Sequence, residues 1–439
     1  MSVTSPASLF SPASRRIAVV ADSDTRWKWG ASVARELAPS HALDAVFLRG
    51  RSTPTERQLA EVGIVPDTRR VLSTSDLVDD EELAAVDVVV LAVSGGTVLA
   101  LTHALGLAWE GRERRPVTVS GYVGVVYEKM VDGLMTRAGT DVVLANSAYD
   151  ADRFARAFDS VGVDPASVVE CALPFLGGEP HRPSRDRPFT LTFAVQPSVP
   201  KDREARLHLL GRAARHARRH PEREVLIKLR SLPGEQTTHV EADPYQLLVE
   251  ELPEPAPANL KLVYGNMAEV LDRTDLLVTV SSTAALESMH RGIPTAILTD
   301  LGVREAHGNH YFLHSGCLAS WDDLDAGALP RPLPEWAAAQ GIGKTDPYAA
   351  ARARLTHLRT AGPLPPMRPY YTPSSAGAYL GPLLERHGLD EKGRPLATPT
   401  TASGRTGRAV RRVAAHGARK LYRMGYQRVA PALRRWGAA

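Results

Sequence analysis

The chain has 439 residues, which is enough for two domains of ordinary size and some additional segments. Its 44% hydrophobic and 23% charged residues are typical of a soluble globular protein, and no apolar run is long enough to span a bilayer. Two cysteines, Cys171 and Cys317, exclude a disulfide framework or a paired-cysteine metal site and favour a reducing compartment. The net charge of +4 is small, but residues 404–439 hold ten Arg or Lys and no acidic residue.

Short apolar, β-branched runs followed by helical patterns recur along most of the chain, after residues 1–14, which we expect to be a disordered lead. Continuous rather than alternating hydrophobicity predicts strands that are covered on both faces, and therefore parallel sheets with crossover helices. We predict an α/β fold of two doubly wound Rossmann-like domains facing a cleft, residues 15–180 and 181–330. About five runs fall in each half: 17–20, 44–48, 87–93, 117–119 and 141–145, then 191–195, 225–228, 260–263, 276–280 and 295–298.

The pattern changes around and after the second domain. Residues 177–188 are rich in Gly, Pro and charge and are predicted to link the two domains. Residues 331–394 are Pro-rich with one strong helical pattern at 347–360, and we expect them to wrap back over the first domain. Residues 395–439 are interpreted as a flexible linker and a basic, helical, amphipathic tail.

The first strand is followed by residues 21–30, which we interpret as a polar loop with two carboxylates and two tryptophans. Asp22 or Asp24, facing the cleft, could take a proton from an acceptor hydroxyl, and Trp27 could stack on a sugar ring. The alternative is that the acids cap a helix and the tryptophans pack in the core. No further ligand cluster accompanies the Asp-x-Asp pattern, so no metal site is predicted there.

Two later strand ends in the first half offer further contacts. Gly95 and Gly96 open a helix and could allow a close approach of the acceptor, although they lack the dinucleotide-binding spacing. Tyr122 follows the strand at 117–119 and is a third candidate acceptor contact. Glu128, six residues further, is the rival candidate for the catalytic base.

In the second half, basic and polar residues follow the strand runs. Lys228 and Arg230 end the run at 225–228, where they could bind phosphate oxygens, although a solvated strand end is the ordinary alternative. Gly265 and Asn266 lie in a loop before a helix, where backbone groups could contact a base.

The segment 275–294 carries the strongest signal. A buried-type strand runs into Ser281, Ser282 and Thr283, and then into a helix with Glu287 one turn later. Hydroxyls beside the unpaired N–H groups of a helix start can bind phosphate, and the glutamate could bind a ribose diol. The alternative is an ordinary βα unit with a Ser/Thr cap.

These second-half residues, IKLRS at 227–231 and VSSTAALE at 280–287, resemble GT-B-type glycosyltransferases of bacterial capsule and cell-wall polymer synthesis that use CMP-sugars or CDP-alcohols. The resemblance implies that the Ser-Ser-Thr triplet binds the donor phosphate with help from Lys228 and Arg230, and that Glu287 contacts the ribose. Leu229 and Arg230 stand where those families have His-Pro, so the histidine that could protonate the leaving phosphate is missing there.

We therefore expect a metal-independent enzyme without a cofactor that moves a sugar from a nucleotide-sugar, a CMP-sugar being favoured, to a cell-surface polysaccharide or lipid-linked acceptor. The alternatives are a CDP-glycerol-type polyol-phosphate transferase, a UDP-sugar epimerase and a non-catalytic protein that binds through its basic tail. The expected location is the cytoplasm, with residues 404–439 docking on the anionic inner face of the membrane. No sequence motif supports specific nucleic-acid binding.

Overall fold

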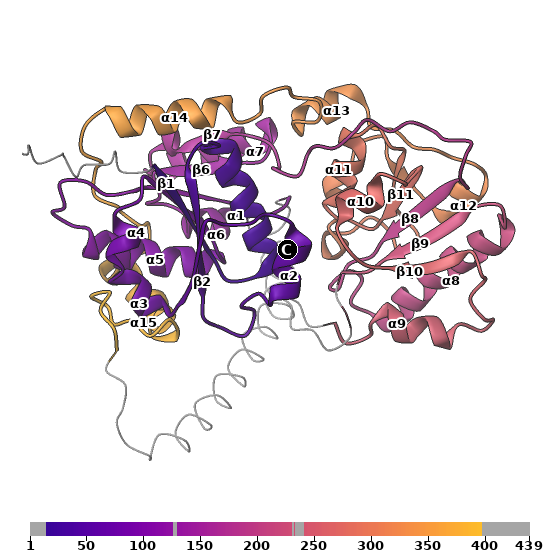
Figure 1. Cartoon of the computed structure of the whole chain (residues 1–439), viewed down its shortest axis with the longest axis horizontal. Helices are drawn as coiled ribbons and strands as arrows, with labels where there is room; N and C mark the ends of the chain where they lie inside the picture. The colour runs from indigo at the N-terminus through magenta and orange to yellow at the C-terminus, as the bar shows by residue number, and fades with distance from the viewer. Residues whose placement is uncertain (1–14, 126–129, 231, 233–240, 397–439) are drawn as a thin grey trace, which may run out of the picture. The chain divides into compact units, whose positions relative to one another are not determined.

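The computed structural model describes residues 15–125, 130–230, 232 and 241–396. This part of the chain is built on a seven-stranded and a six-stranded β-sheet (Figure 1). All neighbouring strands in both sheets run parallel. The prediction of an α/β fold with two doubly wound domains is confirmed.

The N-terminal sheet has the strand order β3-β2-β1-β4-β5-β6-β7, so the order reverses between β1 and β4. Its strands are β1 (Arg16–Ala21), β2 (Ala42–Leu48), β3 (Thr68–Leu72), β4 (Val88–Ala92), β5 (Val117–Gly121), β6 (Val142–Ala145) and β7 (Val168–Glu170). The helices of this domain are α1 (Asp24–Leu37), α2 (Glu56–Val62), α3 (Thr74–Val78), α4 (Glu81–Ala84), α5 (Gly95–Ala108), α6 (Met130–Met135), α7 (Ala148–Ser160) and η1 (Pro165–Ser167).

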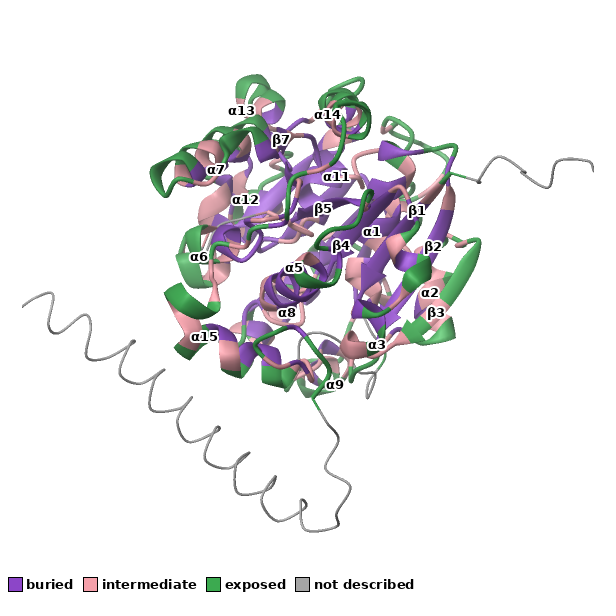
Figure 2. Ribbon diagram, turned by 90° about the vertical axis from the view of Figure 1, so that its left-hand side faces the viewer, coloured by how far each residue is buried: buried purple, intermediate pink, exposed green. Residues whose placement is uncertain are grey.

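Two apolar clusters cover the two faces of this sheet. On one face, alternate strand residues such as Val19 pack with α1, and on the other, residues such as Val20 pack with α3 and α5. Figure 2 shows the strands as mostly buried, between helices whose outer faces are exposed. Nearly all of α5 is buried, because α15 (Pro373–Arg386) covers it on the side away from the sheet.

The C-terminal sheet has the order β10-β9-β8-β11-β12-β13 and reverses between β8 and β11. Its strands are β8 (Thr190–Ala194), β9 (Glu224–Lys228), β10 (Leu260–Val263), β11 (Leu276–Thr279), β12 (Thr295–Leu298) and β13 (Leu318–Ala319). The helices around it are α8 (Arg203–Arg219), α9 (Tyr245–Leu248), η2 (Val249–Glu251), α10 (Met267–Leu271), α11 (Ala284–His290), η3 (Glu305–His307), η4 (Asn309–Phe312) and α12 (Trp321–Asp325). Helices α8, α9 and α12 pack on one face, and α10, α11 and η4 pack on the other.

The segment between the domains is anchored to the second sheet. Asp275 accepts hydrogen bonds from both terminal guanidinium nitrogens of Arg187 and from the Thr190 N–H, and its carboxylate lies 3.0 Å from the His181 ring. Burial alone would raise the pKa of Asp275, but these contacts outweigh burial and lower it. The end of the predicted 177–188 linker is therefore fixed by a buried carboxylate.

The last described part of the chain returns to the first domain. Helix α13 (Pro334–Ala339) contributes to the second domain's cluster, whereas α14 (Ala349–Thr360) and α15 pack on opposite faces of the N-terminal sheet (Figure 1). The predicted lead 1–14 and the basic tail lie outside the described residues. None of the described helices combines the length and apolarity that a membrane crossing requires.

Three strands are absent from the sequence prediction: β3, β7 and β13. All three lie at sheet edges, where one side of the strand has no partner. β3 carries two arginines, and β7 and β13 have only three and two residues. Edge strands therefore lacked the apolar run that identified the central strands.

Candidate functional site

The carboxyl edge of the C-terminal sheet brings three predicted loops together. Lys228 at the end of β9 pairs in register with Ala194 of β8, and Ala194 pairs with Thr279 of β11. Adjacent strands lie about 4.8 Å apart, so the segments that follow Lys228 and Thr279 start roughly 10 Å from each other. Because the strand order reverses between β8 and β11, this is where a doubly wound sheet places its ligand.

Lys228 is a buried cation. Its side chain is 6% exposed, its Nζ donates to the Leu229 carbonyl at 2.5 Å, and it forms no ion pair with any described carboxylate. The pKa of Lys228 is lowered from 10.5 to about 8, mainly by burial; Glu61 opposes this shift, and the nearby charges of Lys28 and Arg230 add to it. A buried ammonium at a sheet edge that no carboxylate of the described ranges neutralises is suited to an anionic ligand.

Arg230 connects this edge to the first domain. Its guanidinium donates to the hydroxyl of Thr25 and lies 3.8 Å from the carboxylate of Asp24. Asp24 is the first residue of α1, immediately after the switch point between β1 and β4. The structure thus brings together Asp24 and Arg230, which the sequence analysis placed in separate sites.

The three hydroxyls after β11 have different environments. Ser281 is buried, donates its hydroxyl to the His307 carbonyl at 2.6 Å and its N–H to Gln196 Oε1 at 3.0 Å. Ser282 accepts from the Ala284 N–H at 3.3 Å. Thr283 is the N-cap of α11 but makes no side-chain cap bond. The Ser281 hydroxyl is already used to hold the loop, so Ser282 and Thr283 are the better candidates for contact with a phosphate.

Glu287 lies in the first turn of α11, one turn beyond the hydroxyls as the sequence indicated. Its side chain is 6% exposed, and burial raises its pKa, which Lys28 and then Arg291 oppose. In the neighbouring loop, Gly265 has φ +92°, and Asn266 uses its side-chain oxygen to cap α10 through the Ala268 N–H at 3.0 Å. The side chain of Asn266 therefore caps α10, and a contact between the backbone of this loop and a base stays a prediction.

The two candidate carboxylates of the first domain also differ. Asp22, which precedes the cap of α1, is paired with Arg26 of that helix at 2.6 Å, whereas Asp24 faces Arg230 of the second domain. Glu128, the rival candidate for the base, lies outside the described residues. Of the two described carboxylates, Asp24 is the one directed at the predicted donor site.

Packing corrects one of the four predicted acceptor contacts. Trp27 is fully buried and stacks edge-on against Phe47 at 5.3 Å between ring centroids, so no ring face remains for a sugar. A β-carbon on Gly95 would lie 2.6 Å from Thr136, and one on Gly96 would lie 3.2 Å from Leu383 of α15. These two glycines permit close packing of protein against α5, and their contact with an acceptor stays a prediction.

Tyr122, the fourth predicted contact, is held in place by its neighbours. Its hydroxyl donates to the Met130 carbonyl at 3.2 Å, and the guanidinium of Arg137 lies 3.9 Å from its ring centroid. Arg137 is itself buried and donates to the carbonyls of Gly121 and Gly133. Tyr122 therefore shapes the loop after β5, and its contact with an acceptor stays a prediction.

Sequence reasoning missed Lys28. It follows Asp24 by four residues on α1, and its Nζ lies 4.6 Å from the centroid of the Phe175 ring. The segment 21–30 was interpreted as a loop, but Ser23 caps a helix that begins at Asp24. Helical spacing from Asp24 was the signal that would have identified Lys28.

The described residues contain one group of potential metal ligands, His216, His220 and Asp325. Asp325 is already bonded to His216 at 2.7 Å and paired with Arg219 at 3.1 Å. The group lies at the C-terminal end of α8. The N-terminal end of α8 follows β8 at the carboxyl edge of the sheet, so the group lies at the end of the helix away from the candidate site. We interpret it as an ion-pair network that joins α8 to α12.

Three histidines, His307, His310 and His314, are spaced three and four residues apart in the sequence. His307 lies in η3, His310 in η4 and His314 in a turn with φ 63°, so the three do not share one regular helix.

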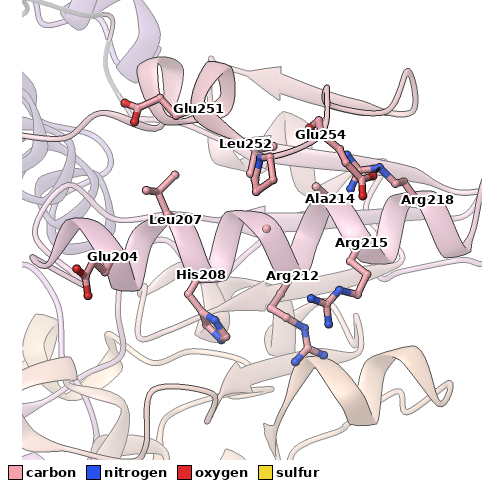
Figure 3. Close-up of a pocket in the computed structure, with 12 residues that line it drawn as sticks. Glu204, Leu207, His208, Arg212, Ala214, Arg215, Arg218, Glu251, Leu252 and Glu254 are labelled. Carbon is pink, nitrogen blue, oxygen red and sulfur yellow. Dashed lines mark hydrogen bonds and ion pairs between the residues drawn. The ribbon is translucent and has the colours of Figure 1, made fainter.

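A cavity of 570 Å³ lies elsewhere in the second domain, along α8 (Figure 3). Leu207 and Ala214 of α8 face Leu252 across it, and Glu204 and Arg218 lie toward its two ends. None of the predicted site residues lines this cavity.

Similar solved structures include UDP-GlcNAc 2-epimerase from Neisseria meningitidis bound to UDP-GlcNAc, at 13% identity over 79% of this chain and 99% of that one, with a TM-score of 0.47. The S. aureus MnaA–UDP co-structure matches at 13% identity over 79% and 96%, with a TM-score of 0.49. A UDP-glucosyltransferase from Polygonum tinctorium matches at 13% over 80% and 95%, with a TM-score of 0.44.

The search of curated proteins gave no match. A family model described as "Putative glycosyltransferase (DUF6716)" matches residues 17–358, which include both sheets and most of α14. The predicted resemblance to GT-B-type glycosyltransferases is confirmed at the level of family and fold, and the chain belongs to this glycosyltransferase family.

Proposed function

We propose that this protein transfers a glycosyl group from a nucleotide-sugar, with a CMP-sugar favoured, to a cell-surface polysaccharide or lipid-linked acceptor. The observation that carries the proposal is Lys228, a buried cation that no described carboxylate pairs with, at the carboxyl end of β9 and one strand away from the switch point between β8 and β11. Burying such a charge is unfavourable unless an anion compensates it. The phosphate of a nucleotide-sugar is an anion of the right kind at the right edge of the sheet.

Lys228 and Arg230 would stabilise the negative charge that develops on the leaving phosphate. A fixed cation facing that oxygen lowers the barrier in the same way as a bound divalent ion would. We therefore propose that the reaction needs neither a metal nor a further cofactor. Activity should survive EDTA, and a loss that only a divalent ion restores would contradict this part of the proposal.

Asp24 is our preferred base for the acceptor hydroxyl. It follows the switch point of the first sheet and faces the donor side through Arg230. Holding donor and acceptor from opposite sheet edges would supply the positioning that a two-substrate transfer requires.

A CDP-glycerol-type transferase is the alternative that the same residues support, because Lys228 and Arg230 would bind the phosphate of either donor. The product separates the two. A glycosyl product contains no phosphorus from the donor, whereas a polyol-phosphate product retains it. Mass spectrometry of the acceptor after reaction therefore distinguishes them.

The direct test is calorimetric titration of the wild type and Thr283→Val with CMP, CDP, UDP and GDP, in EDTA. The Thr283 hydroxyl at the start of α11 is removed without a change of volume, and Thr360→Val on the exposed end of α14 is the matched control. Selective binding of a cytidine nucleotide that weakens only in Thr283→Val supports the proposal. A preference for UDP or GDP retains the transferase but discards the CMP-sugar, and binding of none contradicts it.

For the basic tail we propose docking on an anionic membrane surface from the cytoplasmic side, next to a lipid-linked acceptor. Each well-placed Lys or Arg contributes about 1 kcal/mol to such binding, and residues 404–439 hold ten. A chain truncated before Gly404 should lose co-sedimentation with phosphatidylglycerol vesicles and retain nucleotide binding. Equal sedimentation of both chains would contradict the proposal.

A further inference from the structure

One face of α1 is directed at the second domain. The Thr25 hydroxyl accepts a hydrogen bond from Arg230, and the Asp24 carboxylate lies 3.8 Å from the same guanidinium. Residues three and four positions apart share a helix face, so Lys28 follows Thr25 and Asp24 on this face, roughly 5 Å further along the axis. Lys28 therefore lies on the face of α1 that carries the contacts with Arg230.

Lys28 is a half-buried cation without a described counter-ion. Its Nζ lies 4.6 Å from the centroid of the Phe175 ring, and it forms no ion pair with a carboxylate in the described part of the chain. The ring holds the ammonium in place while removing part of its hydration. Such a charge gains more from an incoming anion than an exposed lysine does, because less water must be displaced.

The charge of Lys28 acts on two residues of the second domain. Burial raises the pKa of Glu287, and of the charges that oppose this rise Lys28 is the largest, ahead of Arg291. Burial lowers the pKa of Lys228, and among the cations Lys28 lowers it more than Arg230 does. The charge of Lys28 therefore acts at both Glu287 on α11 and Lys228 at the end of β9.

We propose that Lys28 is a phosphate ligand that the first domain supplies to the donor site of the second, so that the leaving phosphate is held by Lys28, Lys228 and Arg230 together. This inference rests on the proposed function. Three cations at one place repel each other in the free protein, and a nucleoside mono- or diphosphate removes that repulsion. The ligand class that the set fits is a phosphate carrying two or three negative charges.

In the transfer step, the bond between the anomeric carbon and the phosphate oxygen breaks, and its electron pair stays on that oxygen. The acceptor oxygen forms the new bond to the anomeric carbon and gives its proton to the carboxylate base. The phosphate gains one negative charge, which Lys28 faces from the side of the first domain. Lys28 therefore binds the leaving group more strongly than the intact donor, which is the condition for lowering the barrier.

The experiment compares Lys28→Met, Lys28→Arg and the control Arg35→Met, which removes one positive charge from the other end of α1. Each variant is titrated calorimetrically with cytidine, CMP and CDP and with uridine, UMP and UDP. Lys28→Met should bind the preferred nucleotide about 10- to 100-fold more weakly, the range typical of a hydrogen bond to a charged group. Binding of the parent nucleoside should be unchanged, and Lys28→Arg and Arg35→Met should bind like the wild type within about fivefold.

A merely structural role for Lys28 would weaken nucleoside and nucleotide equally, and that result would overturn the inference. Unchanged nucleotide affinity in Lys28→Met would overturn it as well, while leaving the proposed function intact. A wild type that binds no nucleotide would overturn both. Cooperative thermal unfolding confirms that each variant is folded, and Lys28→Gln provides the same comparison if the Met variant is not.

Discussion

Lys228→Met should stabilise the free protein while it removes nucleotide binding. The substitution keeps an unbranched apolar chain of similar length and deletes the buried ammonium, whose side chain is 6% exposed. Burial lowers the pKa of Lys228 from 10.5 to about 8, which corresponds to roughly 3 kcal/mol of unfavourable charge burial at pH 7. We expect the variant to gain up to about 3 kcal/mol in its free energy of unfolding.

The pH dependence gives the same prediction a second readout. In the wild type, the folded protein releases the Lys228 proton near pH 8, whereas the unfolded chain holds it until about 10.5. The unfolded state therefore binds more protons in this window, so the lysine's unfavourable contribution disappears as the pH rises through it. Nucleotide affinity should follow the opposite course and fall up to about tenfold per pH unit above pH 8, because the neutral amine no longer attracts phosphate.

Urea unfolding and calorimetric titration between pH 7 and 10 test both effects. The matched control is Lys261→Met on the neighbouring strand β10, an exposed lysine paired with Glu224 at 2.6 Å, whose loss should change stability by less than about 1 kcal/mol. A Lys228→Met variant that is less stable than the wild type, or that binds nucleotide with the wild-type affinity and pH profile, would refute the reasoning.

Three further predictions concern variants in which a carboxylate is replaced by an amide. Asp24→Asn should lower the turnover rate by about 100-fold or more without weakening nucleotide binding, because it removes the base and releases Arg230, and an unchanged rate would point to another base. Asp150 is buried at the start of α7, and neither of its carboxylate oxygens is hydrogen-bonded. Burial raises its pKa to about 6. The free energy of unfolding should therefore fall as the pH rises from about 4 to 6, because the buried carboxyl loses its proton in this range. Asp150→Asn should abolish this fall and be about 3 kcal/mol more stable at pH 7 in urea unfolding, whereas a less stable variant would show that the charge is compensated. Asp275→Asn should lower the free energy of unfolding by at least about 2 kcal/mol above pH 5. The loss should shrink in acid, because the wild-type carboxylate is protonated there and its charge is lost as well. A loss that does not depend on pH would contradict the role of the charge.

The sequence was sufficient for the architecture because central strands of a parallel sheet carry the apolar signal on both faces. Leu276 to Thr279 and the hydroxyls that follow are a case in which a buried strand and its loop are contiguous in the chain. Three of the four edge strands, β3, β7 and β13, were missed because an edge needs fewer apolar residues, whereas the run at 260–263 identified β10.

The contents of the site were harder to predict, because which side of a helix faces the core depends on where the helix begins. With Ser23 as the cap of α1, Trp27 falls on the buried side and Lys28 on the side that faces the second domain. When the same segment is interpreted as a loop, Trp27 is instead expected to be open to a ligand and Lys28 is not identified. Gly96 was likewise interpreted as open to a ligand. The sequence around Gly96 does not indicate that Leu383 of α15, almost 300 residues later, packs beside it.

The most direct test of the account is the location of the phosphate in a crystal structure of the complex with the nucleotide that binds most tightly. The account predicts phosphate oxygens within hydrogen-bonding distance of Lys228 and Arg230, beside Thr283 at the start of α11. A nucleotide bound in the cavity along α8, or anywhere away from the carboxyl edge of the second sheet, would contradict it.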